Sequence, residues 1–507
     1  MTGTDHSEPT VTELRRLAAG VLIPAVGRTV VPRWVEARIA DGVGGFIPYG
    51  RNITDAAQVR TMTARLHELR DHVLVAIDEE GGDVNRLEDA GGISVPGNRA
   101  LGRLDDLDAT REAAFQIGLS LVEAGVDWDL APAVDAAVNP LSPNGIRCFG
   151  ADRDLVSRHA AAWVEGLQAA GVSACAKHYP GHGASGTDAH LGSPRIDISR
   201  EELLESYLDP FRAAIAAGVD SIMVSHDLLP QVDDVPATIS HELLTVILRG
   251  ELGYEGVIIT DALEMAGIHD VAPLEVSAPA AIAAGADALC LGSAAFDEDT
   301  ATAIDAIVAA VHAGTLSVER LRDANARLAR LGTRPRADLA ARDASIGERL
   351  AERVTEVDGD VVLHGERTLV VELQPTHSPA AGRAGSSVVD LLRQEGREVE
   401  TITIAGGSYN GAAAVRAEVG QFRGEFGDAG DVVLLVRSPH RFEWQRPLVD
   451  ALLTAHPGIV AVDMGVPELD LSGFRGWIRT YGASRVCAQA AVRRLLASDR
   501  EPAVAAT

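Results

Sequence analysis

A supersecondary unit that recurs through the first two-thirds of the chain constrains the fold more than any other feature. In each copy, an Ala-rich segment of helical character ends at a glycine and leads into a short apolar run. Glycine suits the left-handed backbone position just past a helix end, so the pattern predicts helices that alternate with strands. The copies are Ala124-Gly125-Val126-Asp127, Ala170-Gly171-Val172, Ala217-Gly218-Val219-Asp220 and Ala284-Gly285-Ala286-Asp287.

The apolar runs of this first part are candidate strands, and they number eight. Continuous apolar strands that alternate with helices are typical of a parallel sheet covered on both faces. Eight such units predict an α/β fold of the (β/α)8 barrel type, with functional side chains at the carboxyl ends of the strands. The runs are Gly20–Ile23, Gly45–Pro48, Val73–Ile77, Trp128–Ala131, Ser173–Ala176, Ser221–Val224, Gly256–Ile259 and Ala288–Leu291.

Polar residues follow five of these runs, at the positions where a barrel would place a functional site. An Asp at a strand end is often only a helix cap. Helix capping explains the five groups together less well than it explains any one of them, because in a barrel all five strand ends point to the same opening. The residues are Asp78-Glu79-Glu80-Gly81-Gly82-Asp83-Val84-Asn85-Arg86, then Asp135 and Arg147, then Lys177 and His178, then Ser225-His226-Asp227, and finally Thr260-Asp261.

The stretch from Lys177 to His190 concentrates more chemistry than any other. Its fourteen positions hold one Lys, three His, one Asp and three Gly. Such loops at strand ends commonly carry function, and Asp188 is placed to orient the imidazole of His190 for acid/base catalysis. A metal site is a second interpretation, with His178, His182, Asp188 and His190 as ligands, although a Pro-Gly pair excludes a helical zinc motif here. A purely structural His/Asp turn is the third.

Length and composition describe a globular protein with more than one domain. The chain has 507 residues, more than one core usually accommodates. Strand-like runs stop after residue 334, and Ala, Arg, Asp and Glu then dominate. We expect the barrel over 1–334, a helical linker over 335–360 and a smaller C-terminal α/β sandwich domain over 361–507. Its expected strands are Thr368–Leu373, Glu398–Ile404, Val432–Val436 and Ile459–Val462, and its expected helices include Val388–Leu392 and Leu448–Leu453.

The expected C-terminal domain carries no compact set of catalytic residue types. Its Gly-rich segment Gly406-Gly407-Ser408-Tyr409-Asn410-Gly411 follows an expected strand. The segment lacks the Lys and Ser/Thr of a phosphate-binding P-loop, so we interpret it as a turn.

Charge, hydropathy and cysteine usage exclude several classes of partner. Acidic residues exceed basic ones by 73 − 45 = 28, which argues against a nucleic-acid-binding face. The first ten residues have no apolar core of a signal peptide, and no run of about 18 apolar residues predicts a membrane span. Four scattered cysteines suit a reducing compartment. We therefore expect a cytoplasmic location, and neither nucleic acid nor membrane as a partner.

Motifs that span nearly the whole expected barrel form a recognisable set. The run from Lys177 to His190 matches a Lys-His-(Phe/Tyr)-Pro-Gly-His-Gly signature followed by Asp-x-His, which is long and specific. With these motifs the chain resembles glycoside hydrolase family 3, and within it the bacterial β-N-acetylhexosaminidases, including those of peptidoglycan recycling. The other matching motifs are Asp78-Glu79-Glu80-Gly81-Gly82 with Arg86, Ala131-Pro132-Ala133-Val134-Asp135, Arg147-Cys148-Phe149-Gly150, Pro236-Ala237-Thr238-Ile239-Ser240 and Gly256-Val257-Ile258-Ile259-Thr260-Asp261.

The resemblance implies a retaining glycoside hydrolase that releases terminal β-linked N-acetylglucosamine from a small amino-sugar glycoside. Asp261 would be the nucleophile and form a covalent glycosyl-enzyme, while His190 would protonate the leaving oxygen with Asp188 as its partner. A carboxylate nucleophile suits an oxocarbenium-like transition state. An imidazole whose ordinary pKa is about 6.5 exchanges protons near neutral pH, and a neighbouring carboxylate favours its protonated form.

The resemblance also implies a set of sugar-binding positions, and it implies no metal or organic cofactor. Asp78 can accept hydrogen bonds from sugar hydroxyls, while Lys177 and His178 can donate to them. The implied sugar-binding residues are Asp78, Arg86, Arg147, Lys177 and His178.

Three positions depart from the family pattern, and three alternative functions stay open. Asp83 stands where relatives often have Arg, Cys148 where they have a small hydroxyl residue, and Ala262 where many have Asp. Phosphorolysis of the same bond is the closest alternative, because a neutral imidazole does not repel a phosphate dianion as a carboxylate would. A β-glucosidase is less expected because of the Asp-x-His loop. A non-catalytic sugar-binding barrel is less expected because Asp261 and His190 are both present.

Overall fold

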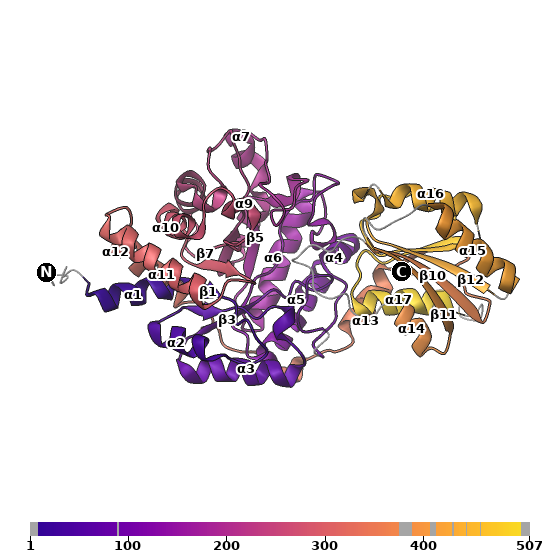
Figure 1. The fold of residues 1–507 in the computed structure, drawn as a ribbon, viewed down its shortest axis with the longest axis horizontal. Helices are drawn as coiled ribbons and strands as arrows, with labels where there is room; N and C mark the ends of the chain where they lie inside the picture. Colours follow the sequence, from indigo (N-terminus) through magenta and orange to yellow (C-terminus); the bar gives the residue numbers. More distant parts are fainter. Residues whose placement is uncertain are drawn as a thin grey trace.

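The computed structural model describes residues 9–88, 91–374, 388–405, 412–427, 430–442, 444–456 and 458–497. An N-terminal part and a smaller C-terminal part lie side by side, with α13 (Ile346–Val354) where they meet (Figure 1). Strands alternate with helices in both parts, so the predicted α/β class is confirmed. The Gly-rich segment 406–411 lies outside the described residues.

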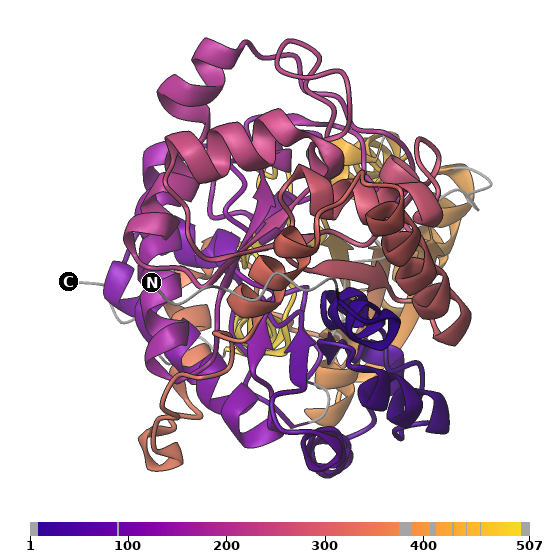
Figure 2. The same cartoon turned by 90° about the vertical axis from the view of Figure 1, so that its left-hand side faces the viewer.

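All eight expected N-terminal strands are present, each at or next to its predicted position. They are β1 (Leu22–Pro24), β2 (Gly45–Phe46), β3 (Leu74–Ile77), β4 (Trp128–Asp129), β5 (Cys175–Tyr179), β6 (Ser221–Val224), β7 (Val257–Thr260) and β8 (Leu289–Gly292). Helices lie around these strands when this part is viewed from its end (Figure 2). None of the described helices is long and apolar enough to cross a membrane.

The helices of this part come between the strands in chain order. The α-helices are α1 (Val11–Gly20), α2 (Arg33–Asp41), α3 (Ala56–Leu69), α4 (Asn98–Leu104), α5 (Leu107–Ala124), α6 (Arg153–Ala169), α7 (Arg200–Glu202), α8 (Asp209–Ala216), α9 (Ala266–His269), α10 (Leu274–Ala284), α11 (Asp297–His312) and α12 (Val318–Leu328). Two π-helical segments are η4 (Leu203–Tyr207) and η6 (Glu242–Glu251). Short 3₁₀ turns are η1 (Gly50–Asn52), η2 (Gly145–Arg147), η3 (His182–Ala184), η5 (Ala237–Ile239) and η7 (Leu339–Ala341).

Every recorded ladder between the N-terminal strands is parallel. β1 pairs with β8, β3 lies between β2 and β4, and β6 lies between β5 and β7. Isolated parallel bridges link further neighbours at or beside the strand ends. These bridges are Ala25–Ile47, Trp128–Ser173, Ala133–Lys177 and Ile259–Ala288. Parallel pairing sends all the carboxyl ends of the strands to one side, where the charged residues follow.

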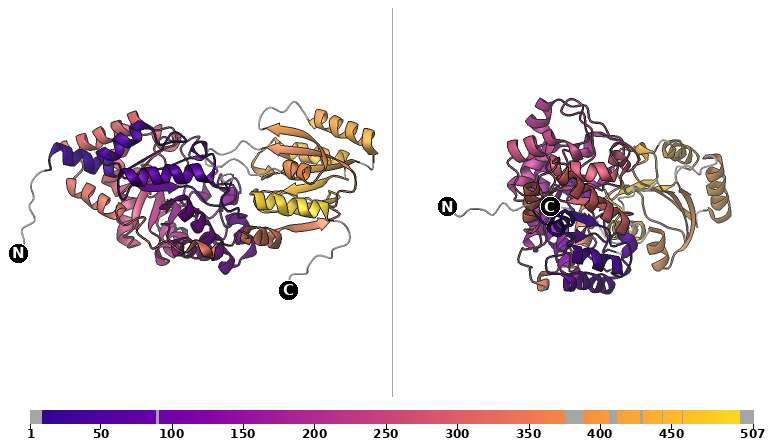
Figure 3. Two further views of the ribbon diagram at one scale, coloured as in Figure 1. Left: turned by 90° about the horizontal axis from the view of Figure 1, so that it is seen from below. Right: turned by 60° about the vertical axis from the view of Figure 1, so that its left-hand side comes forward.

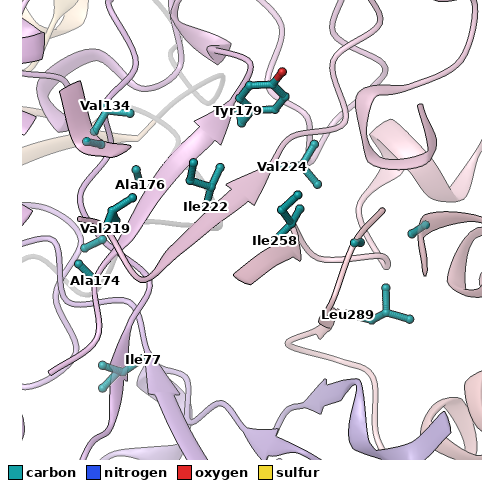
Figure 4. Close-up of a cluster of buried hydrophobic side chains, with 14 of the residues drawn as sticks. Ile77, Val134, Ala174, Ala176, Tyr179, Val219, Ile222, Val224, Ile258 and Leu289 are labelled. Atoms are coloured by element: carbon teal, nitrogen blue, oxygen red, sulfur yellow. The ribbon is translucent and has the colours of Figure 1, made fainter. Parts of the chain in front are cut away.

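The buried side chains of the strands alternate between two hydrophobic clusters, as the two-residue period of a strand requires. One cluster packs between the strands and the helices, and Figure 4 shows part of it, including Tyr179, Ile222, Val224 and Ile258. A separate cluster takes residues from seven strands and from the position directly after β2. Its members include Ile23, Ile47, Leu74, Ala76, Trp128, Cys175, Met223, Val257, Ile259 and Cys290.

The glycine expected just past a helix end is well illustrated by α5. Gly125 has a φ of +76°, and its N–H donates to the carbonyls of Leu121 and Val122. A Cβ at this position would lie 2.5 Å from the Thr63 hydroxyl oxygen. At the other end of α5, the Asp106 side chain accepts from the Ala109 N–H and caps the helix. Local sequence therefore fixes both ends of this helix.

Several predicted boundaries shift by a few residues, and two of the differences concern charged or exposed segments. The strand expected to end at Ala176 continues to Tyr179, so Lys177 and His178 lie on β5. Buried carboxylates pair with both side chains, Glu80 with Lys177 and Asp135 with His178, which lets the strand bury these polar residues. The stretch 335–360, expected to be a helical linker, contains α13 but ends in strand β9 (Glu356–Gly359). This strand is exposed at a sheet edge and lacks an apolar run, which is why its sequence does not resemble a strand.

The C-terminal part is a six-stranded sheet in the order β11-β10-β12-β13-β14-β9. Among the strands that the structure describes there, only β9 is antiparallel to its neighbour. Separate hydrophobic clusters pack on the two faces of the sheet, beneath helices. The strands are β10 (Arg367–Gln374), β11 (Glu398–Ala405), β12 (Gly430–Val436), β13 (Val460–Asp463) and β14 (Gly476–Arg479), and the helices are α14 (Val388–Gln394), α15 (Ala412–Phe426), α16 (Gln445–Ala455), α17 (Arg485–Leu496) and the turn η9 (Pro439–Arg441).

The four expected C-terminal strands and the two expected helices all match observed elements. The sequence prediction missed β9 and β14, which together form the antiparallel edge of the sheet. Both are four residues long and carry charged residues, so neither has the apolar run by which the other strands were found.

Candidate active site

The eight residues singled out from the sequence lie around two adjoining pockets at the carboxyl ends of the N-terminal strands. The larger pocket, of about 760 Å³, is lined by residues that follow β3, β4, β5 and β7. The smaller one, of about 320 Å³, shares several of these walls. Asp78, Arg86, Arg147, Lys177, His178, His190 and Asp261 line the larger pocket, and Asp188 lines the smaller one.

A buried network of alternating charges forms the floor of the larger pocket. Lys177 lies between two carboxylates, with Nζ 2.7 Å from Asp78 Oδ1 and 2.6 Å from Glu80 Oε1. Glu80 accepts two further hydrogen bonds from Arg147, at 2.9 Å from Nε and 2.7 Å from Nη2. Burial alone would raise the pKa of Glu80, but Arg147 and Lys177 outweigh it and hold that pKa well below its usual range. Arg86 approaches Asp78 at 3.9 Å.

Asp135 holds His178 in one tautomer. The Nδ1–H of His178 donates to Asp135 Oδ2 over 2.8 Å, and Asn144 donates to the same oxygen over 2.7 Å. Arg147 donates to His178 Nε2 over 3.4 Å. Asp135 is fully buried, yet its pKa lies below the ordinary value because His178 and His182 outweigh the effect of burial. The ring of His178 is therefore fixed at the junction of the two pockets.

His182 is a buried cation in the wall of the smaller pocket. Its Nδ1–H donates to Asp227 Oδ1 over 2.8 Å, and its backbone N–H donates to Asp135 Oδ1 over 2.7 Å. Burial would lower the pKa of His182, but Asp227 outweighs it and raises this pKa to about 9. Ser225 donates to the other oxygen of Asp227 over 2.5 Å. This wall is thus built from residues that follow β4, β5 and β6.

Asp261 directly follows β7 and lines both pockets. Its backbone N–H donates to the Val224 carbonyl over 2.8 Å, and its Oδ1 accepts from the Ala262 N–H over 2.7 Å. Burial alone would raise the pKa of this carboxyl group. The imidazoles of His178, His226 and His190 outweigh burial and lower it below its ordinary value. Asp261 is therefore held as a carboxylate, which is the form a nucleophile needs.

Asp188 and His190 form a compact pair on the loop after β5. Asp188 Oδ1 accepts from both the backbone N–H and the Nδ1–H of His190, each over 2.9 Å. Burial would lower the pKa of His190, but the hydrogen bond to Asp188 and the nearby Asp261 carboxylate outweigh it and raise this pKa above 6.5. Because Nδ1 is bound to Asp188, Nε2 is the ring nitrogen that can serve a ligand.

Comparison with known proteins shows which family has this combination of residues. Residues 29–331 match the pattern described as the glycosyl hydrolase family 3 N terminal domain. The chain belongs to glycosyl hydrolase family 3. It is a glycosidase, and its substrate is a sugar compound.

Some relatives of this glycosidase match about half of the chain, and others match nearly all of it. A "Beta-hexosaminidase" of Pseudomonas aeruginosa is 39% identical over 246 residues, which are 48% of this chain and 74% of the relative. A "Beta-N-acetylglucosaminidase/beta-glucosidase" of Cellulomonas fimi is 31% identical over 493 residues, which are 88% of this chain and 84% of the relative. The solved structure of a glycoside hydrolase family 3 β-N-acetylglucosaminidase from Paenibacillus sp. str. FPU-7 gives a TM-score of 0.84 at 30% identity, over 96% of this chain and 97% of that one.

Sequence reasoning about this glycosidase missed several residues that shape the pockets. Glu80, Asp135 and Asp227 lie in motifs noted at strand ends, but the sequence did not show that they orient Arg147, His178 and His182. Asn144, Tyr49, Glu264 and Ser293 also line the pockets. Asn144 lies on an irregular loop, outside every motif noted in the sequence, so nothing in the sequence indicated that it lines a pocket. Among the residues that the structure describes, no group of three or more His, Cys, Asp or Glu could hold a metal ion.

Proposed function

We propose that this glycosidase releases terminal β-linked N-acetylglucosamine with retention of anomeric configuration, through a covalent glycosyl-enzyme on Asp261. The observation that carries this proposal is that an ionised carboxylate and a protonated imidazole line the same pocket. Asp261 has a lowered pKa and is held ionised, while the nearby His190 has a raised pKa and is held protonated by Asp188. A charged nucleophile beside a protonated acid is what the first step of a double displacement requires.

In the first step, an Asp261 oxygen attacks the anomeric carbon while the bond from that carbon to the leaving oxygen breaks. The Nε2–H of His190 protonates the leaving oxygen, so the alcohol departs neutral. Asp188 stabilises the imidazolium before this transfer and keeps Nδ1 protonated after it. The negative charge of Asp261 is neutralised when its oxygen forms the glycosyl ester.

In the second step, the neutral His190 acts as a general base. Its Nε2 takes a proton from water while the water oxygen attacks the anomeric carbon and the bond to Asp261 breaks. The Asp261 carboxylate returns to its lowered-pKa state among the three imidazoles. The two inversions leave the product with the β configuration of the substrate.

The charged floor of the larger pocket supports the binding of the sugar hydroxyl groups. Asp78 can accept from a hydroxyl, while Lys177, Arg86, Arg147 and His178 present nitrogen atoms to the same space. Because Asp78 and Glu80 already hold Lys177, its side chain needs no reorganisation when the sugar binds. Relatives named for hexosaminidase and N-acetylglucosaminidase activity support an N-acetylglucosaminide as the substrate.

The proposed architecture is a (β/α)8 barrel over 1–334 and a smaller α/β domain over 361–507. The parallel pairings and bridges between consecutive strands support the barrel, as does the hydrophobic cluster drawn from all around them. The residues between 335 and 360 would connect the domains and contribute edge strand β9 to the second one.

A release assay on 4-nitrophenyl β-N-acetylglucosaminide tests the proposal. We expect release of free N-acetylglucosamine at a rate independent of added phosphate, and NMR spectra should show the β anomer forming first. A phosphate-dependent rate that yields a sugar 1-phosphate would identify a phosphorylase instead. First formation of the α anomer would exclude double displacement. Absence of release with this compound and with the matching glucoside would overturn the proposed activity.

A further inference from the structure

A segment of the C-terminal part lies against the loop that forms the wall of the smaller pocket. This segment runs from Arg437 to Arg441, between β12 and α16. The His440 Nε2–H donates to the Pro140 carbonyl over 3.0 Å, and Arg441 Nη1 donates to the Pro143 carbonyl over 3.2 Å. Pro143 itself lines the smaller pocket beside Asp188 and His190. Two further views of the ribbon show the C-terminal part beside the N-terminal part (Figure 3).

An ion pair between the two parts fixes the same segment to a second loop. Arg437 Nη2 lies 3.3 Å from Asp83 Oδ1, and the two side chains are only 20% and 19% exposed. Asp83 is one of the positions where this chain departs from the family pattern, so the departure coincides with a partner of opposite charge in the C-terminal part. The loop that contains Asp83 also carries Arg86 of the larger pocket.

The guanidinium of Arg441 lies near the acid/base pair. Burial lowers the pKa of Arg441, and the Asp188 carboxylate opposes that effect more than any other group. Its Nε is buried without a hydrogen-bond partner among the described residues. A half-buried cation within electrostatic reach of Asp188 stabilises that carboxylate and disfavours a second positive charge nearby.

We propose that Arg441 is a positioning residue of the active site, supplied by the C-terminal part, which sets the ionisation of the Asp188–His190 pair and fixes the pocket wall through Pro143. This inference rests on the proposed role of His190 as acid and base. It gives the C-terminal part an indirect role in the reaction, since none of the described residues of that part lines either pocket.

Several other charges act on His190, and the effect of Arg441 must be separated from theirs. The titratable groups around the ring are Asp188 and His182 on the same loop, His178 on β5, Asp261 after β7, Arg147 after β4 and His226 after β6. None of these residues is altered in the experiment, so a change in the pKa of His190 reports on the substituted arginine.

The decisive measurement is the pKa of His190 in the full-length protein, from an NMR titration of labelled histidine. Arg441→Gln removes the charge but keeps an N–H that can reach the Pro143 carbonyl, and Arg441→Lys keeps the charge. His190→Gln assigns the signal. We expect Arg441→Gln to raise the pKa of His190 by about 0.5, because a repelling cation is lost. Arg441→Lys should leave this pKa near the wild-type value.

A matched control and a kinetic readout complete the test. Arg446→Gln alters an exposed arginine of the same region that forms an ion pair with Asp450 in α16, and it should change neither the pKa of His190 nor turnover. In Arg441→Gln, the alkaline limb of kcat/KM on the 4-nitrophenyl substrate should move up with the pKa.

The titration does not need turnover, so it decides the inference even where the proposed substrate is not cleaved. An unchanged pKa of His190 in Arg441→Gln would overturn the inference, whether or not activity falls, because a purely structural arginine would give that result. Where Arg441→Gln does not fold, Arg441→Met replaces it, because methionine removes the charge and keeps an unbranched apolar side chain at this position. A raised pKa of His190 in that variant supports the role of the charge, and an unchanged pKa contradicts it.

Discussion

Asp261 and Asp463 occupy equivalent places in the two parts of the molecule, and their chemistry is opposite. Asp261 directly follows the parallel strand β7, and Asp463 is the last residue of the parallel strand β13. The pKa of Asp261 lies below its ordinary value because three imidazoles outweigh burial. Burial dominates at Asp463 and raises its pKa to about 7.

The difference lies in what surrounds each carboxyl group. Asp261 opens onto two pockets and faces cations from neighbouring strand ends. Asp463 is 1% exposed, accepts one hydrogen bond from the Gly465 N–H, and has Arg479 no closer than 4.0 Å. A carboxyl-end position on a parallel strand therefore does not by itself indicate a catalytic residue. The catalytic role that we propose for Asp261 rests on the convergence of complementary charges on an open pocket.

The largest expected effect comes from substituting the two aspartates in the same way. Asp261→Asn should reduce turnover of the 4-nitrophenyl substrate by about 10⁴-fold, since an amide is a poor nucleophile and the covalent step is lost. Asp463→Asn should leave turnover within about twofold of wild type, because its neighbours carry no substrate-facing group. Steady-state kinetics at neutral pH, with circular dichroism to check the fold, measures both.

Either variant can contradict the contrast between Asp261 and Asp463. A folded Asp261→Asn protein that keeps wild-type turnover would remove Asp261 from the mechanism. An Asp463→Asn protein that folds normally but has lost activity would show that the C-terminal strand end contributes to the reaction. Either result would contradict the assignment of chemistry to the N-terminal strand ends.

The sequence predicted the residues that line the pockets far better than the residues that orient them. The long His-rich motif and the Asp after a buried strand were visible because polar residues interrupt apolar runs. The eight residues named from the sequence all line the pockets. The partners Glu80 and Asp135 stood in the same motifs, but their pairing with Arg147 and His178 joins residues 67 and 43 positions apart, which local pattern cannot reveal.

The edge of the C-terminal sheet shows a different limit of sequence reasoning. β9 and β14 pair antiparallel at the end of a parallel sheet, and each is short and partly charged. β9 lies at the exposed edge, and β14, between β13 and β9, alternates buried and half-buried residues, so neither has the apolar run by which strands are found. The contact between Arg437 and Asp83 was equally hidden, because it depends on how the two parts pack.

The second expected effect concerns the acid/base pair and its pH dependence. Cleavage requires an ionised Asp261 and a protonated His190, so activity should fall below the lowered pKa of Asp261 and above the raised pKa of His190. The optimum should thus extend above the ordinary histidine value of about 6.5. His190→Gln should reduce turnover about 10²- to 10³-fold and abolish the alkaline limb.

A matched histidine variant and a second substrate sharpen this test. His312→Gln changes an exposed residue at the end of α11 and should leave the pH profile unchanged. The loss in His190→Gln should be greater for an alkyl glycoside than for the 4-nitrophenyl compound, because a poor leaving group needs the proton more. Equal losses for the two substrates, or an alkaline limb that persists, would exclude His190 as the acid.

The smallest expected effect is on the pH dependence of stability, and it concerns Asp463. The pKa of Asp463 is about 7 in the folded protein, against an ordinary value of 3.8. Between these two pH values, the folded protein keeps the proton of Asp463 and the unfolded chain has released it. The free energy of unfolding should therefore decrease, by a few kcal/mol at most, as the pH rises from about 4 to 7. Asp463→Asn cannot ionise and should lose this contribution to the pH dependence. Urea unfolding at pH 5 and pH 8 measures it as the difference between variant and wild type, which cancels every other titrating group. Identical pH dependence in the two proteins would mean that Asp463 is solvated like an ordinary surface carboxylate, and its contrast with Asp261 would then disappear.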